Sequence, residues 1–134
     1  MNTQEIAHYV QERLLDGGYI VQRYDSYSTN SIYLKLDYGV MNSIRISDHR
    51  GKKGLSYRYN LLQQHKSVTK HYNGKHPRYF YGFQFVDEML LEIFQDKLEK
   101  LARYGADRYT SYMIGNSMSN AGRRGFWSQC TLLH

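Results

Sequence analysis

The sequence predicts a single α+β domain, spanning residues 1–134, in which helices pack against a four-stranded antiparallel sheet. The chain has 134 residues, the size of one ordinary domain. Apolar residues recur at helical spacing near the N-terminus and again after residue 85, and they alternate in a strand-like pattern between these segments. Fourteen tyrosines contribute to the 41% hydrophobic fraction. Their ring and hydroxyl suit half-buried sheet faces and wet contact surfaces.

The first predicted element is a helix over about residues 3–16. Its apolar stripe consists of Ile6, Val10 and Leu14, at four-residue spacing. Asn2 or Thr3 caps its start, and Glu5 lies three residues after Asn2, as in a capping box. The Gly17-Gly18 pair supplies the left-handed ending that helices favour.

Two strands are expected next, at residues 19–24 and 31–36. The first is rich in β-formers, and in the second Ile32, Leu34 and Leu36 alternate with Ser31, Tyr33 and Lys35. A short turn at residues 37–39 leads to a third strand, residues 40–46, so the second and third strands form a hairpin.

A basic turn at residues 47–54 precedes a fourth strand, residues 55–61, and the sheet is expected to be an antiparallel meander. Residues 63–78 are polar, with Val68 as the one interior apolar residue, and predict a long loop. Loops of this length are usually functional or mobile, which suits a contact arm.

A long C-terminal helix is predicted over about residues 85–104. Its stripe consists of Val86, Leu90, Ile93, Phe94, Leu98 and Leu101. Gly105 closes this helix, and residues 106–119 predict a further, weaker helix. The long helix is the natural cover for the apolar face of the sheet.

Positive charge is concentrated in one segment, residues 45–81. This segment holds nine basic residues and one acid, Asp48, a net charge of +8, whereas the whole chain has a net charge of +6. The remainder of the chain therefore carries a net charge of −2. Such an asymmetry is typical of a surface that meets an anionic partner.

The basic segment interleaves cations with aromatic rings, the combination that phosphate contact and base stacking use. The residues predicted to contact nucleic acid or another partner are Arg45, Arg50, Lys52, Lys53, Arg58, Lys66, Lys70, Lys75, Arg78, Tyr57, Tyr59 and Tyr79. This prediction requires the cations to share one face. The alternative is that one tyrosine face belongs to the core and the lysines are simply solvated.

No catalytic or metal site is predicted. Ser47-Asp48-His49 has the residue types of nucleophilic catalysis, but neighbours in a turn cannot generally reach relay geometry. His65, His71 and His76 do not match zinc-ligand spacing. The single cysteine, Cys130, excludes an internal disulfide. We expect no cofactor.

Three stretches carry a resemblance to a known group of proteins. They are Asn30-Ser31-Ile32-Tyr33-Leu34, Ser43-Ile44-Arg45-Ile46-Ser47-Asp48-His49 and Leu55-Ser56-Tyr57-Arg58-Tyr59-Asn60-Leu61. Across residues 28–62 the chain resembles small orphan proteins of bacteriophages and other mobile elements, among them anti-CRISPR inhibitors. The resemblance implies docking on an RNA-guided nuclease or its guide RNA. It transfers no site residue, and the basic segment departs from the acidic, DNA-mimicking members.

The sequence therefore favours a cytoplasmic, non-enzymatic binder of nucleic acid or of a ribonucleoprotein, of the anti-CRISPR inhibitor type. Its expected partners are guide RNA or DNA, an RNA-guided nuclease, or both, with no membrane. One alternative is a protein-protein interaction module or homodimer that uses tyrosines and the Phe126-Trp127 tail as anchors. The other is a small nuclease with His49 or a loop histidine as general base.

Overall fold

The computed structural model describes residues 1–36, 43–50, 57–72, 77–120 and 131–133. The N-terminal helix, α1 (Thr3–Asp16), confirms the predicted boundaries. The Asn2 side chain accepts from the Glu5 amide at 2.8 Å, and the Glu5 carboxylate accepts from the Asn2 amide at 3.3 Å. Both halves of the predicted capping box are therefore present. The chain leaves the helix through Gly17, and Gly18 has a positive φ of 82°.

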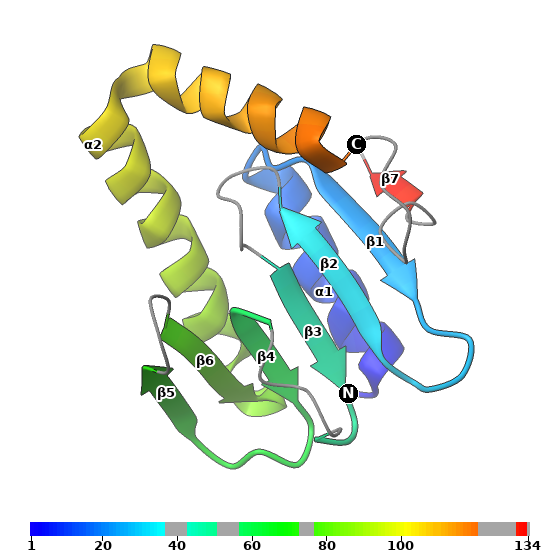
Figure 1. Ribbon diagram of the computed structural model, residues 1–134. Coiled ribbons are helices and arrows are strands. Elements are labelled where there is room, and N and C mark those ends of the chain that lie inside the picture. The colour runs from blue at the N-terminus through cyan, green and yellow to red at the C-terminus, as the bar shows by residue number, and fades with distance from the viewer. Residues whose placement is uncertain (37–42, 51–56, 73–76, 121–130, 134) are drawn as a thin grey trace.

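Within the described residues, six strands and a short seventh form one mixed sheet in the order β5-β6-β4-β3-β2-β1-β7 (Figure 1). The strands are β1 (Val21–Asp25), β2 (Ile32–Leu36), β3 (Ser43–Ser47), β4 (Tyr59–Leu62), β5 (Val68–Tyr72), β6 (Pro77–Gly82) and β7 (Thr131–Leu133). The first three strands are consecutive antiparallel neighbours, as predicted.

The predicted four-stranded meander is wrong from β4 onward. β4 lies parallel to β3, with Ile46 beside Leu61, and parallel to β6, with Leu61 beside Tyr81. The expected hairpin turn between the third and fourth strands is instead a crossover. Its residues 51–56, and the predicted turn at 37–39, lie outside the described residues.

The predicted loop over residues 63–78 is also wrong, because it contains β5 and the first residues of β6. These two strands form an antiparallel hairpin, with Thr69 beside Phe80. β5 lies at the edge of the sheet, where both faces of the strand can meet water, so its sequence lacks apolar alternation. Val68 was the one apolar residue available to indicate a strand.

The C-terminal helix, α2 (Val86–Asn120), follows a short 3-10 turn, η2 (Phe83–Phe85). It breaks at Gly105, where φ is 76° and ψ is 163°, values that side-chain-bearing residues rarely adopt. The break confirms the predicted helix ending at Gly105 and the further helix after it. Figure 1 shows the second arm turning back across the end of the sheet. None of the described helices is long and apolar enough to cross a membrane.

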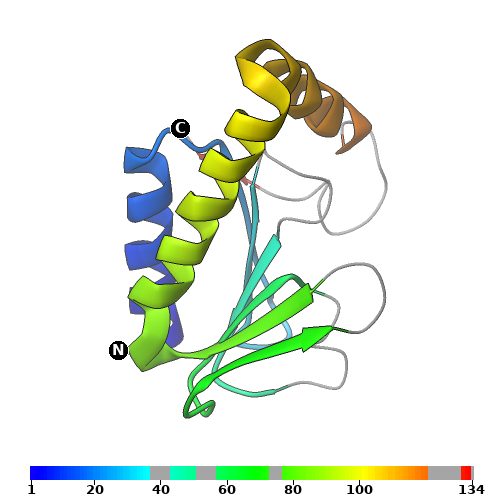
Figure 2. The same ribbon diagram turned by 90° about the vertical axis from the view of Figure 1, so that its left-hand side faces the viewer.

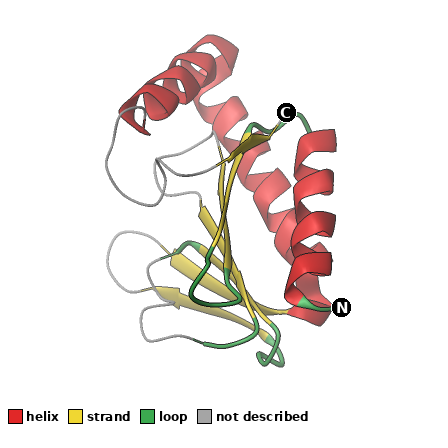
Figure 3. Cartoon of the chain, turned by 90° about the vertical axis from the view of Figure 1, so that its right-hand side faces the viewer, coloured by secondary structure: helices red, strands yellow, loops and turns green. Residues whose placement is uncertain are grey.

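α1 and the first arm of α2 lie on one side of the sheet, and the second arm of α2 passes beyond the end of the sheet toward the other side, as Figures 2 and 3 show from opposite directions. The residues of this layer form one buried cluster, which includes Leu14 of α1, Val21, Leu34, Ile46, Tyr59 and Tyr81 of the sheet, and Met89 and Ile93 of α2. We call this side of the sheet the helix-covered face. Residues that alternate with the cluster along each strand point to the opposite side, the helix-free face.

Candidate nucleic-acid interface

Strand pairing aligns five residues in one row across the helix-free face. The row consists of Tyr24, Tyr33, Arg45, Asn60 and Phe80, from β1, β2, β3, β4 and β6. Each of these residues alternates with core residues of its own strand, as Tyr33 does with Ile32 and Leu34. Tyr24 and Tyr33 therefore lie on one side of Arg45, the cation at the centre of the row.

Three tyrosines form a continuous contact series on this face, which we call the tyrosine row: Tyr24, Tyr33 and Tyr57. The ring centroids of Tyr24 and Tyr33 are 6.2 Å apart, and those of Tyr33 and Tyr57 are 5.1 Å apart. All three rings are partly exposed. Burial, reinforced by the nearby Tyr33, raises the pKa of Tyr57 to about 12. Tyr57 therefore keeps its proton at neutral pH and can donate a hydrogen bond.

Arg45 is buried, with 4% of its surface exposed, and its guanidinium fixes the turn that follows β3. Nη1 donates to the carbonyl oxygen of Arg50 at 3.0 Å, and Nη2 donates to the carbonyl oxygen of His49 at 3.4 Å and to the hydroxyl of Ser47 at 3.3 Å. These acceptors are neutral, and no ion pair among the described residues involves Arg45. Arg45 thus positions the turn and adds positive charge beneath it.

The Arg50 pocket lies beside this turn and has a volume of about 250 Å³. It is lined by Arg50, Leu62, Gln64 and His65. The His65 ring is held by Thr69, with 3.0 Å between Nε2 and Oγ1. Burial is the main cause that lowers the pKa of His65, and the charges of Arg50 and His71 add to it. The described lining residues offer a cation, an amide and an imidazole and include no carboxylate, so this pocket suits an anion such as a phosphate.

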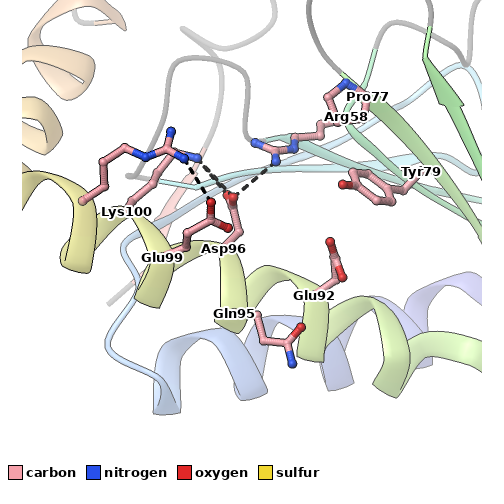
Figure 4. A pocket seen from close by; sticks show the side chains of 9 residues that line it. Arg58, Pro77, Tyr79, Glu92, Gln95, Asp96, Glu99 and Lys100 are labelled. Carbon is pink, nitrogen blue, oxygen red and sulfur yellow. Dashed lines mark hydrogen bonds and ion pairs between the residues drawn. The ribbon is translucent and has the colours of Figure 1, made fainter.

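Arg58 lies in a different environment, a pocket of about 350 Å³ between the start of β4, β6 and α2 (Figure 4). Its Nη2 donates to Oδ1 of Asp96 at 3.3 Å, and Lys100 Nζ donates to Oδ2 of Asp96 at 3.1 Å. Among the residues that the structure describes, the lining holds three cations and three carboxylates: Arg58, Lys100 and Arg103, with Glu92, Asp96 and Glu99. This pocket is therefore less suited to a polyanion than the Arg50 pocket.

Two of the predicted stacking residues belong to the core. Tyr59 is fully buried and Tyr79 nearly so, and their rings stack on each other at 5.4 Å on the helix-covered face. Neither ring has a face available for a base. Tyr57, just before β4, is the one of the three predicted tyrosines that reaches the helix-free face.

The expectation that the cations share one face holds only in part. Arg45 and Arg78 point to the helix-free face by strand alternation, and Arg50 lines a pocket there. Lys70 instead lies 4.7 Å from the ring centroid of Tyr79, and Arg58 is paired with Asp96. Lys66 is exposed between β4 and β5. Lys52, Lys53 and Lys75 lie outside the described residues.

Ser47-Asp48-His49 is arranged as a turn. The Ser47 hydroxyl accepts from the His49 amide at 3.2 Å, and the Asp48 carboxylate accepts from the Asn30 amide group at 3.0 Å. The Ser47 hydroxyl is thus bonded to the backbone of the turn, and the Asp48 carboxylate is bonded to the loop before β2. Over the part of the chain that the structure describes, no cluster of three potential metal ligands occurs.

Sequence reasoning missed Tyr24 and Tyr33 as site residues. The signal for Tyr33 was present, because alternation places it opposite Ile32 and Leu34. The sequence does not show which residues lie beside Tyr33 on the neighbouring strands. The strand register places it beside both Tyr24 and Arg45.

Comparisons of the chain with protein-family models, with curated proteins and with solved structures return no match.

Proposed function

We propose that the helix-free face binds unpaired nucleic acid without chemical change to it. The tyrosine row stacks on bases, and Arg50, held by Arg45, contacts a phosphate at the Arg50 pocket. The single observation that carries this proposal is the juxtaposition of three partly exposed rings with a buried guanidinium that has no carboxylate partner among the described residues.

The energies of such contacts are sufficient for a useful affinity. Stacking of one base on an aromatic ring contributes about 1–3 kcal/mol, and it tolerates any base sequence. The net charge of +6 adds an attraction that salt weakens, because phosphate contacts release condensed counterions. Tyr57, which stays protonated, offers a donor to a phosphate or base oxygen.

The biological setting that we propose follows from the resemblance in residues 28–62. An inhibitor of an RNA-guided nuclease would meet unpaired guide RNA or displaced DNA, and both present bases for stacking. The helix-free face would compete with the nuclease for the nucleic-acid strand; it would not imitate that strand. This agrees with the excess of cations in residues 45–81.

Binding of a fluorescently labelled single-stranded RNA or DNA oligonucleotide, measured by anisotropy, tests the proposal. Tyr33→Ala is expected to weaken binding by about 5- to 150-fold, the equivalent of one lost stack, whereas Tyr33→Phe keeps most of the affinity. Arg50→Gln should reduce the slope of log affinity against log salt by about 1. The matched control is Tyr104→Ala, which removes an exposed ring from the helix layer.

Two results would overturn the proposal. One is that the wild-type protein binds neither RNA nor DNA at low salt. The other is that Tyr33→Ala and Tyr104→Ala have equal effects. Recovery of intact oligonucleotide after prolonged incubation separates binding from the alternative of a nuclease that uses His49.

A further inference from the structure

β5 forms the outer edge of the sheet on the side of α2, with no further strand beyond it among the described residues (Figure 1). Edge strands expose a row of backbone donors and acceptors that can pair with another chain. The direction of those groups follows from the hydrogen bonds of the β5-β6 hairpin.

Two bonds fix which backbone groups point outward. The Gly82 amide donates to the carbonyl oxygen of Ser67 at 3.2 Å, so Ser67 faces β6. In an antiparallel pair this direction alternates, so Thr69 and His71 also face β6, and Val68 faces outward with every second residue after it. The Tyr79 amide donates to the carbonyl oxygen of Arg58 at 2.7 Å, so it points toward β4 and away from β5. This is the direction that the alternation requires for the residue paired with Lys70.

The position of the only proline agrees with this alternation of inward-facing and outward-facing residues. Pro77 pairs with Tyr72, one of the outward-facing residues of β5. A residue opposite an outward-facing position makes no hydrogen bond to β5, so the missing N–H of Pro77 costs the hairpin nothing.

The side chains of this edge favour an acidic occupant. Residues 63–72 contain Lys66, Lys70 and four further residues with ring or amide donors, Gln63, Gln64, His65 and His71, but no aspartate or glutamate. Val68, with 47% of its surface exposed, gives an apolar contact between the two lysines. A second copy of the same edge would bring lysines together, and like charges facing across strands are destabilising.

We propose that the outer edge of β5 binds an extended, acidic segment of a partner protein by strand addition. Main-chain hydrogen bonds to the outward-facing residues supply affinity, and carboxylates of the added strand face Lys66 and Lys70. This surface is separate from the tyrosine row, so the proposal stands independently of nucleic-acid binding.

A set of synthetic eight-residue peptides that alternate glutamate with valine or threonine provides the probe. Amide chemical-shift changes in the full-length protein are expected to concentrate in residues 66–72. Peptides N-methylated at alternate residues should bind about two- to tenfold more weakly for each hydrogen bond lost. Replacing the glutamates by lysine should abolish binding.

Protein variants supply the complementary test. Val68→Pro removes an outward N–H and leaves the hairpin bonds intact, so it should weaken peptide binding while circular dichroism stays native. Thr69→Ser changes the neighbouring inward-facing residue, keeps the hydroxyl that holds His65, and should leave peptide affinity unchanged. The Lys66→Glu, Lys70→Glu double variant should prefer the lysine peptides.

Three results would overturn strand addition. The first is an absence of shift changes in β5 with every acidic peptide. The second is equal affinity of N-methylated and unmodified peptides, which would indicate attraction by charge alone. The third is that an RNA oligonucleotide, but no peptide, perturbs these amides.

Discussion

At the scale of single residues, two arginines predicted to contact a partner make bonds within the fold. Arg45 fixes the turn after β3 through neutral acceptors, and Arg58 joins the start of β4 to α2 through Asp96. Their charges were visible in the sequence, but their partners were not. Arg58 and Asp96 are 38 residues apart, and nothing local indicates that they meet.

Asp96→Ala is expected to lower the free energy of unfolding by about 1–3 kcal/mol, because it leaves Arg58 and Lys100 without their shared carboxylate in a largely buried site. Urea denaturation measures the change. Glu99→Ala is the control, since its pair with Arg103 is exposed and should contribute less than about 1 kcal/mol. Equal effects of the two substitutions would contradict a structural role for the Asp96 contacts.

His65 should make the protein less stable in mild acid. Its pKa is lowered in the folded state, mainly by burial, below the ordinary value of 6.5. The unfolded chain therefore binds a proton more readily, and the stabilising contribution is lost as pH falls below about 6.5. Unfolding free energies of the wild type and His65→Gln, compared from pH 5 to 8, should converge at low pH. An NMR titration that places the His65 pKa above 6.5 would contradict this.

At the scale of elements, two glycines determine where elements end: Gly82 at the end of β6 and Gly105 at the break in α2. Gly82 ends β6 where an added Cβ would overlap the carbonyl oxygen of His65. Gly105 divides α2 with a positive φ, and a Cβ there would meet nothing within 4 Å. The first requires glycine for space, and the second requires it for backbone conformation.

Gly105→Ala should lower the free energy of unfolding by about 1–3 kcal/mol, because alanine is strained at the observed φ and ψ while its methyl group has room. Thermal and urea unfolding measure the loss. Leu98→Ala, an exposed position of the same helix, should change it by no more than about 0.5 kcal/mol. A neutral Gly105→Ala would show that α2 can pass this point as a straight helix.

Local patterns predicted the elements that are made from local contacts. The cap at Asn2, the alternation in Ile32–Leu36 and the glycine at 105 each act within a few residues, and each prediction was confirmed. β5 was missed because an edge strand needs no apolar face. The parallel pairing of β4 was missed because it depends on residues far along the chain.

The candidate site was predictable to a lesser degree. Arg45, Arg50 and Tyr57 lie on or beside the helix-free face, but Tyr59 and Tyr79 alternate into the core. A tyrosine that lines a core and one that lines a ligand surface look alike in sequence. The covering helices decide which face of the sheet remains for contact.

At the scale of the whole molecule, the sheet consists of two antiparallel units joined by a strand that is parallel to both. β1, β2 and β3 form one unit with β7, and β5 and β6 form the other. β4 lies between them, and its four residues are all buried. Both units contribute to the single cluster beneath the helices.

The parallel pairing of β4 has a consequence for the chain as it is synthesised. When residue 62 leaves the ribosome, β4 can reach β3, but its other edge stays open until residues 77–82 arrive. The apolar residues of β4 then border water, which favours capture by chaperones or by a neighbouring nascent chain. Until β6 is made, the growing polypeptide therefore presents an unpaired, apolar strand edge.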